Sequence, residues 1–163
     1  MAQYVEISPE RSAKGIIKNN NYVVLSTCSK GGMPWAAAVL FVNDKDYNLH
    51  FMSAVDSRHA KNIIENPNIA GVIFDSKQPV GSSQSVQFEG IAKIVDEKKE
   101  IVKTISLYSK KAFPGSKFSP DPEFDPENYS GASEFKFFKI EPKNIFITGV
   151  ERTEKVNLKT INE

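Results

Sequence analysis

The sequence predicts a mainly β fold, an antiparallel barrel with a few helices, and two observations lead to this class. Several segments of strand length, rich in β-branched and aromatic residues, are separated by turns of Gly, Pro, Asn and Asp. Few segments show helical periodicity, whereas each strand of a parallel sheet needs a crossover, usually a helix. Successive strands are therefore expected to pair antiparallel and to form a barrel.

The composition is that of one ordinary globular domain. The 163 residues are 40% hydrophobic and 25% charged, which does not fit a disordered chain. We expect a single domain over residues 1–150 and a loose polar tail over residues 151–163. The net charge of +1 gives no basis for binding nucleic acid or a membrane surface.

Cysteine content and hydropathy predict the compartment. The single cysteine, Cys28, cannot form an intrachain disulfide, which is typical of the reducing cytoplasm. The first residues lack a basic segment followed by an apolar stretch, so no signal peptide is expected. The longest apolar run, residues 35–42, is much shorter than the roughly 20 residues that span a bilayer. We therefore expect a cytoplasmic protein without a membrane segment.

Three helices are expected from their start and stop signals. Ser8 and Ser57 are placed as N-caps, the first followed by Pro9, and Pro67 ends the second helix. Asp96 is expected to cap a third helix, which runs to about residue 111. This helix should pack through the apolar residues Ile101, Val102, Ile105 and Tyr108.

The strands are expected between these helices and after them. The run at 35–42 is continuously apolar, which predicts a strand buried on both faces. Gly90 within a long strand indicates a bulge or a close backbone approach. Residues 113–133 contain several prolines and should be irregular, and so long a loop in a small domain is usually functional or mobile. Strands are expected at residues 22–28, 35–42, 48–53, 69–75, 84–95, 134–140 and 144–148.

The segment Ser57-Arg58-His59-Ala60-Lys61 carries the clearest chemistry, because it places basic side chains in the first turn of a helix. The positive end of the helix dipole lies there, so each cation is disfavoured by roughly 0.3–1 kcal/mol. Free backbone N–H groups, the Ser57 hydroxyl and the Arg58 guanidinium would together hold a phosphate. Lys61 shares a helix face with Arg58. On spacing alone, a capped helix with solvated cations is the alternative.

Several motifs follow one another in a specific order between residues 22 and 96. In this order and spacing the chain resembles the pyridoxamine 5'-phosphate oxidase-like superfamily of FMN-binding split barrels. Within it, Ser-Arg-His-Ala, Val-Gln-Phe-x-Gly and a strand like Trp35–Ala38 are closest to the uncharacterised YhbP-like branch. The motifs are Val24-Leu25-Ser26-Thr27, Gly32-Met33-Pro34, His50-Phe51-Met52-Ser53, Ser57-Arg58-His59-Ala60, Asn66-Pro67 and Val86-Gln87-Phe88-Glu89-Gly90.

The resemblance implies an FMN-binding split β-barrel of antiparallel Greek-key type, working as a homodimer with the cofactor at the interface. It implies that Arg58 and His59 bind the FMN phosphate, with Ser57 as the helix cap. Lys61 is added to this set for its position three residues after Arg58. Further residues are implied around the cofactor: Met52 and Ser53 by the ribityl chain and phosphate, Ala37, Ala38, Val39 and Leu40 beside the isoalloxazine, and Gln87 in the same region.

The chain departs from the true oxidases at positions that matter for their chemistry. Ala37 and Val42 stand where the oxidases carry an Arg and a Lys, and Ser85 stands where they carry a Gln. The oxidases' C-terminal Trp, Arg and Pro signature has no counterpart in residues 150–163. Oxidation of pyridoxamine phosphate itself is therefore not expected.

Other candidate sites give weaker signals. His50 is expected to be structural, and Cys28 to be a small packed residue rather than a nucleophile paired with His59. Trp35 is expected either to pack in the core or to stack near the flavin or at the dimer interface. The acidic residues at 121–127 alternate like a calcium loop but lack its central Gly and terminal Glu. Two histidines and one cysteine make a structural zinc site unlikely to form.

Two functions of different classes follow. The first is a flavin-dependent oxidoreductase that acts on a small substrate with an electron donor such as NAD(P)H. The second is a non-catalytic module on the same scaffold that stores, senses or handles flavin or haem, because fold does not determine function. A split barrel that has lost its cofactor and serves as an interaction domain is a third reading.

Overall fold

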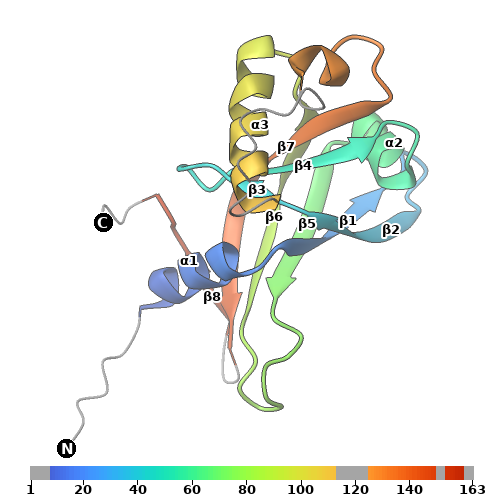
Figure 1. The fold of residues 1–163 in the computed structure, drawn as a ribbon. Coiled ribbons are helices and arrows are strands. Elements are labelled where there is room, and N and C mark those ends of the chain that lie inside the picture. The colour runs from blue at the N-terminus through green and yellow to red at the C-terminus, as the bar shows by residue number, and fades with distance from the viewer. Residues whose placement is uncertain (1–7, 113–124, 150–152, 160–163) are drawn as a thin grey trace, which may run out of the picture.

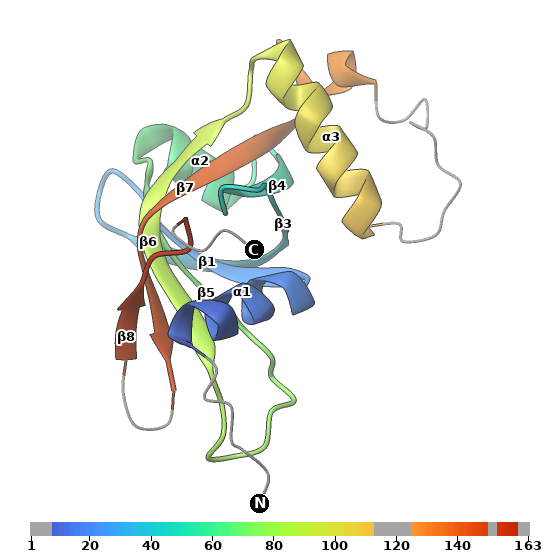
Figure 2. The same ribbon diagram turned by 90° about the vertical axis from the view of Figure 1, so that its left-hand side faces the viewer.

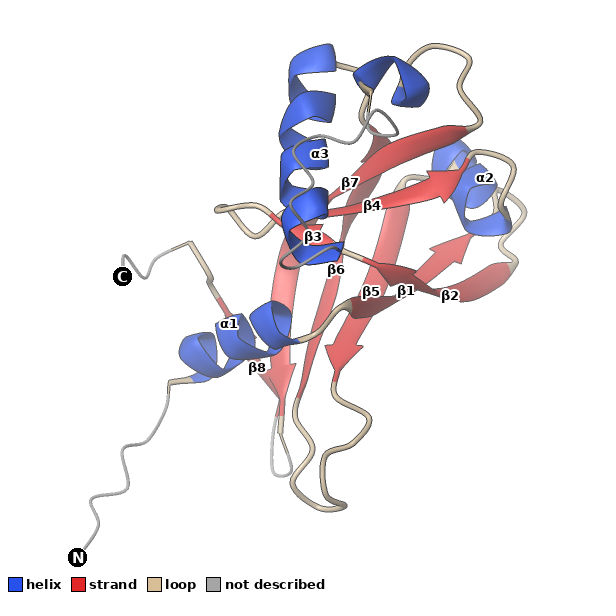
Figure 3. Cartoon of the chain, viewed as in Figure 1, coloured by secondary structure: helices blue, strands red, loops and turns tan. Residues whose placement is uncertain are grey.

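One antiparallel sheet, curled into a half barrel, makes up most of the molecule (Figures 1 and 3). The structure is a computed structural model that describes residues 8–112, 125–149 and 153–159. Its strands are β1 (Tyr22–Cys28), β2 (Pro34–Leu40), β3 (Val42–Asn43), β4 (Leu49–Ala54), β5 (Asn68–Phe74), β6 (Ser85–Ile94), β7 (Phe135–Thr148) and β8 (Thr153–Val156). Their order is β2-β1-β5-β6-β7-β4-β3, and β8 pairs with β7. The predicted mainly β, antiparallel class is confirmed.

The described helices are α1 (Pro9–Asn19), α2 (Arg58–Glu65), α3 (Lys98–Ala112) and the short 3-10 helix η2 (Pro126–Tyr129). The caps predicted at Ser8 and Ser57 are confirmed, because their hydroxyls accept hydrogen bonds from the N–H groups of Arg11 and Ala60, both at 3.3 Å. Figure 2 shows α3 lying at the end of the sheet away from α1. None of these helices combines the length and apolar character needed to cross a membrane.

The start of α3 differs from the prediction. The N–H groups of Glu100 and Ile101 both donate to the carbonyl of Glu97 at 2.9 Å, so the helix begins after Glu97. Asp96 is therefore not its cap, and the Asp96 carboxylate lies 3.6 Å from Nζ of Lys136 instead. Val102, expected on the packed face, is 49% exposed. The buried residues of α3 are Ile101, Thr104, Ile105 and Tyr108.

The apolar run at 35–42 is not buried on both faces, as was expected. It divides into β2 and β3 at Phe41, and β2 lies at one edge of the sheet. Trp35, Ala36 and Ala38 are exposed, whereas Val39 is buried. The small apolar side chains of β2 therefore line a sheet face that no described part of the chain covers.

The bulge expected at Gly90 is confirmed. The register between β6 and β7 shifts between Glu89 and Gly90, and Gly90 then stands opposite Pro142. A Cβ atom at Gly90 would collide with the backbone carbonyl of Glu141. Because the bulge absorbs the irregularity, the two strands expected at 134–140 and 144–148 form the single strand β7.

Two groups of buried side chains hold the fold together. The barrel core lies inside the curled sheet, and α1 and α2 contribute Ala13, Ile17, Ala60 and Ile63 to it. The second group, called here the α3 cluster, lies on the other face of β4 and β7. It consists of Val42, Val95, Ile101, Ile105, Tyr108, Tyr129 and Phe137.

Two segments expected to be irregular contribute to this packing. Val156 and Leu158 are buried in the barrel core, and β8 pairs with β7, so the described part of the C-terminal tail is not loose. In the Pro-rich segment, η2 brings Tyr129 against Phe137 with ring centroids 4.7 Å apart. Residues 113–124 of that segment lie outside the described residues.

Candidate functional site

A compact set of hydroxyl and imidazole groups occupies the junction of β4 and α2. Ser53 lies near the end of β4, and its Oγ is 2.8 Å from Nε2 of His59 and 3.0 Å from Oγ of Ser57. The Ser57 Oγ is 3.3 Å from the same imidazole nitrogen and also caps α2. These contacts fix the capping hydroxyl and the first turn of the helix in one arrangement.

The surroundings of His59 favour the neutral form of its imidazole. Burial lowers its pKa below the ordinary value of 6.5. In the resemblance to the oxidases, His59 occupies a position where a cationic side chain meets phosphate. Here the positive charge of the first helical turn comes from Arg58 and Lys61, both of which are exposed.

Arg58 lies over the indole ring of Trp35. The guanidinium carbon is 4.3 Å from the centre of the indole, which is the geometry of a cation–π contact. The Trp35 side chain is 40% exposed, so it is not a core residue and remains accessible to solvent. The contact links the edge strand β2 to the N-terminus of α2.

A buried hydrogen bond holds α2 against β1 at the same place. Nδ2 of Asn62 donates to Oγ1 of Thr27 at 3.0 Å, and both residues are buried. The Thr27 hydroxyl in turn lies 3.4 Å from the carbonyl oxygen of Trp35. The backbone of Trp35 is therefore connected to α2 through the buried Thr27 and Asn62 as well as through the exposed Arg58.

The remaining predicted site residues lie on different faces of the sheet, because successive side chains of a strand alternate between its two faces. Ala37 and Val39 of β2 face the barrel, whereas Ala38 is exposed on the outer face with Ala36. Met52 packs against the α3 cluster, on the face of β4 opposite to Phe51 and Ser53. The structure therefore does not bring the Met52 side chain to the Ser53–His59 group.

Gln87 lies on the outer face of the sheet. It lines a shallow hollow of about 400 Å³ together with Ser26, Ala70, Val72 and Phe146. The hollow crosses β1, β5, β6 and β7, and continues the uncovered face of β2. Sequence reasoning missed this surface, because its residues come from strands that are far apart in the chain.

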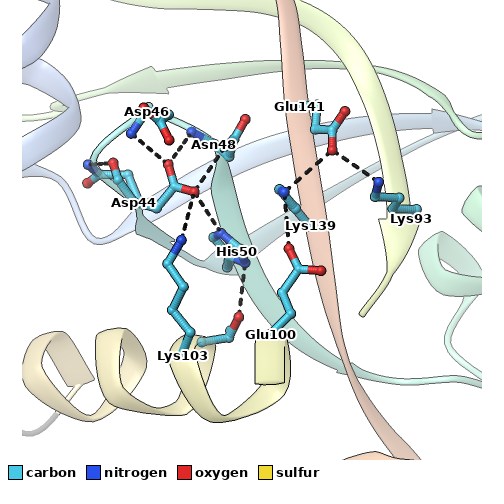
Figure 4. A network of polar contacts seen from close by, with 11 residues as sticks. Asp44, Asp46, Asn48, His50, Lys93, Glu100, Lys103, Lys139 and Glu141 are labelled. Carbon is cyan, nitrogen blue, oxygen red and sulfur yellow. Dashed lines mark hydrogen bonds and ion pairs between the residues drawn. The ribbon is translucent and has the colours of Figure 1, made fainter. Parts of the chain in front are cut away.

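A second polar cluster, also missed, lies between the β3–β4 turn and α3 (Figure 4). The Asp44 carboxylate accepts hydrogen bonds from the N–H groups of Asp46 and Asn48 at 2.9 and 3.0 Å, and from Nδ2 of Asn48 at 3.0 Å. Nζ of Lys103 lies 3.8 Å from the same carboxylate. Burial raises the pKa of Asp44, but these hydrogen bonds and nearby His50 lower it overall.

His50 connects this carboxylate to α3. Its Nδ1 lies 3.2 Å from Oγ1 of Thr104, and its Nε2 lies 3.6 Å from Oδ2 of Asp44, which is too long for a hydrogen bond. Burial lowers the pKa of His50 and outweighs the opposing charge of Asp44. The acid, imidazole and hydroxyl have the order of a catalytic triad, but His50 and Thr104 are 1% and 0% exposed. No substrate can reach these side chains, so the cluster is structural: it attaches α3 to β4.

Among the described residues, no group of three or more His, Cys, Asp or Glu side chains is arranged to hold a metal ion. Of the acidic segment at 121–127, the described Asp125 caps η2 by accepting from the N–H of Glu127 at 3.0 Å. The Glu127 carboxylate pairs with Lys98 at 2.6 Å. These two carboxylates therefore have structural partners.

Comparison with known proteins identifies relatives over much of the chain. A family model described as pyridoxamine 5'-phosphate oxidase matches residues 10–149. The UPF0306 protein PM1958 of Pasteurella multocida is 36% identical over 70 residues, which are 42% of this chain and 47% of that protein. A pyridoxine/pyridoxamine 5'-phosphate oxidase of Ehrlichia ruminantium is 36% identical over 77 residues, 47% of this chain and 38% of that protein. The chain thus aligns with less than half the length of either relative.

The similarity to solved structures covers more of the chain than the similarity to these sequences does. HutZ, the heme storage protein of Vibrio cholerae, superposes with a TM-score of 0.68 at 18% identity, over 90% of this chain and 100% of that one. At this identity the likeness shows the split-barrel fold and nothing about the ligand. Taken with the family model, which extends from α1 to the end of β7, it leads to one conclusion: the chain belongs to the pyridoxamine 5'-phosphate oxidase family.

Proposed function

We propose that this protein binds FMN, with the phosphate at the N-terminus of α2 and the ring system beside β2. The contact of Arg58 with Trp35 carries this proposal, because there a cation, a helix N-terminus and an uncovered apolar strand meet. The first N–H groups of a helix have no intrahelical acceptor, so an anion satisfies them and the helix dipole together. Arg58 and Lys61 add charge, and Ser57 adds a hydroxyl.

The chain's own residues would bind and orient the cofactor. Ser53 and the neutral His59 hold the Ser57 hydroxyl, and Trp35 offers a flat apolar face beside Arg58. Bound FMN would supply the redox chemistry, so the protein needs no acid–base pair of its own. We therefore propose a flavin-dependent oxidoreductase that accepts electrons from a donor such as NAD(P)H in the cytoplasm.

Oxidation of pyridoxamine phosphate is not part of this proposal. Val42, at a position where the oxidases carry a cation, is 2% exposed and packs in the α3 cluster. Ala37 is partly buried against the barrel core. Neither position supplies charge to a phosphate, so binding would depend on the first turn of α2.

We also propose a homodimer, in which a second copy covers the outer sheet face. Ala36, Ala38 and Phe74 are exposed there, next to the hollow lined by Val72 and Phe146. An uncovered face of this kind usually marks an interaction surface, and a two-fold dimer buries the same face of both copies. The cofactor at β2 would then lie next to the partner.

Haem binding without catalysis is the second candidate, since HutZ, a heme storage protein, has the same fold. Haem iron needs an axial ligand, often an imidazole. The chain has two histidines, and His50 is buried with Nδ1 beside Thr104. His59 is therefore the histidine that would serve, at the cost of its contact with Ser53.

An absorbance spectrum of the purified protein, before and after adding FMN or haemin, separates the candidates. Flavin bands, with FMN released by heat and identified by chromatography, support the first. A haem spectrum that His59→Ala alters supports the second. A protein that binds neither added ligand overturns both. Bleaching of bound flavin by NADH or NADPH then distinguishes an oxidoreductase from a flavin store.

A further inference from the structure

The last turn of α3 carries a lysine whose ammonium group is partly withdrawn from water. Lys111 is partly buried, and its Nζ lies 3.8 Å from the centre of the Phe41 ring. Nζ also donates a hydrogen bond to the carbonyl oxygen of Asn20 at 2.7 Å. Asn20 is the C-cap of α1, and Phe41 separates β2 from β3, so Lys111 joins three parts of the fold.

The groups that contact this ammonium are held by other parts of the chain. The N–H of Phe41 donates to the carbonyl of Asn21 at 3.0 Å, and the Phe41 side chain is fully buried in the barrel core. Nδ2 of Asn20 donates to the carbonyl of Ile16 at 2.8 Å. The ring and the carbonyl therefore keep their places whether or not Lys111 carries a charge.

No carboxylate of the described residues forms an ion pair with Lys111. Two other lysines with little exposed surface differ in this respect, because Nζ of Lys136 lies 3.6 Å from Asp96 and Nζ of Lys139 lies 3.0 Å from Glu100. An aromatic face and one carbonyl replace only part of the hydration that a cation loses on burial. Burial accordingly lowers the pKa of Lys111 from 10.5 to about 8.

A lysine in these surroundings is a nucleophile near neutral pH. At about pH 7.4, a pKa of about 8 leaves about one amine in five uncharged, against about one in a thousand for an ordinary lysine. Desolvation beside an apolar surface is one way in which proteins activate the lysine amine. Lys18 and Lys110, in the last turns of α1 and α3, add positive charge where these two helices approach each other. This charge favours an anionic reagent.

We propose that Lys111 is a modification site, which is acylated by a small acyl phosphate. The uncharged Nζ attacks the carbonyl carbon of the acyl phosphate, the bond from that carbon to the phosphate oxygen breaks, and inorganic phosphate leaves. The nitrogen then loses a proton to solvent and becomes a neutral amide. Loss of the charge weakens the contacts with Asn20 and Phe41, so the end of α3 is held less tightly. The site goes beyond the proposed function, because it shares no residue with the N-terminus of α2.

Brief treatment of the protein with limiting acetyl phosphate tests the proposal, followed by mass spectrometry of the peptide that carries Lys110 and Lys111. Lys110 is exposed and adjacent in sequence, so it is the matched comparison. At about pH 7.4, Lys111 should be acetylated at least about tenfold faster than Lys110. The rate at Lys111 should level off by about pH 9, whereas the rate at Lys110 should continue to rise. In concentrated urea the two lysines should react equally, because burial no longer distinguishes them.

Equal rates at Lys110 and Lys111 in the folded protein would overturn the proposal. So would an advantage of Lys111 that persists in urea, since the local sequence and not the fold would then be its cause. Lys111→Arg keeps the cation but lacks the reactive amine, so acetylation of the peptide should fall to that of Lys110 alone. Hydrogen exchange in the last turn of α3 should be faster in the acetylated wild type than in Lys111→Arg treated in the same way. Equal exchange in the two proteins would contradict the loosening of α3.

Discussion

Burial favours the neutral form of both histidines. It lowers the pKa of His50 and of His59 below 6.5, and at His50 the nearby Asp44 and Glu100 oppose this while Lys139 adds to it. A folded-state pKa below the unfolded value means that the unfolded chain binds the proton more readily. The stability that comes from keeping the histidines neutral is fully present above about pH 6.5. It is lost as the pH falls through the pKa values of the histidines in the folded state.

We therefore predict that the free energy of unfolding falls as the pH is lowered from 7 towards 5. Each histidine that remains neutral in the fold contributes a slope of at most about 1.4 kcal/mol per pH unit. Urea unfolding at several pH values measures the slope. His59→Asn, at a partly exposed position, should reduce it. A slope that is the same in the variant and in the wild type would show that His59 titrates equally in both states.

A second prediction concerns Arg58. Replacing it with Ala should raise the dissociation constant of FMN at least about tenfold, because a hydrogen bond to a charged group contributes about 1.5–3 kcal/mol. Fluorescence titration of flavin measures this. Arg11→Ala, which removes an exposed arginine from α1, is the control for net charge. Equal affinity in Arg58→Ala and wild type would remove the phosphate from the N-terminus of α2.

At the scale of elements, the pairing of β6 with β7 is the central feature of the sheet. β7 pairs with β6 along its length, and on its other side with β4 and then β8. The bulge at Gly90 lets this pairing continue past Pro142, which has no N–H to donate. The position therefore needs a residue without a Cβ atom.

Gly90→Ala should destabilise the protein by about 1–3 kcal/mol, because the new methyl group meets backbone atoms of Glu141 and Pro142 that cannot rotate away. Gly15→Ala is the matched comparison. Gly15 lies within α1 with no atom within 4 Å of an added Cβ, so that change should stabilise by about 0.5–1 kcal/mol. Thermal unfolding measures both. A tolerated alanine at Gly90 would mean that the bulge moves.

At the scale of the whole molecule, the features predicted from sequence are those set by neighbouring residues. The caps at Ser8 and Ser57 and the bulge at Gly90 depend on local chemistry, and each is observed. Features set by distant pairing were not predicted. The exposed edge at β2 depends on which strand lies beside it, and the His50 contact joins residues 54 positions apart.

In the candidate site, too, contacts between neighbouring residues could be predicted and contacts between distant residues could not. Ser57, Arg58 and His59 are adjacent in sequence, so their meeting at the N-terminus of α2 followed from the helix signals alone. Met52 and Ser53 are also adjacent, but successive side chains of a strand point to opposite faces. Only Ser53 therefore reaches His59. Trp35 reaches Arg58 across two elements, which local signals could not establish.

The proposed dimer is the feature that concerns the whole molecule most directly. If a second copy covers the outer sheet face, Ala38→Glu should place a charge in that interface and shift the mass in solution from twice 18.2 kDa to the monomer value. Val102→Glu introduces the same charge at an exposed apolar residue of α3 that is not among the residues proposed for the interface, and it should leave the dimer intact. Light scattering measures both masses.

FMN content gives the dimer prediction a second readout. Because the proposed ring site lies beside β2, loss of the partner would uncover the cofactor, and Ala38→Glu should lose FMN together with its dimeric state. Arg58→Ala, by contrast, should lose FMN and remain dimeric, since Arg58 contacts Trp35 within its own chain. A monomeric wild-type protein with FMN bound would contradict the interface and require the whole cofactor site to lie within one copy.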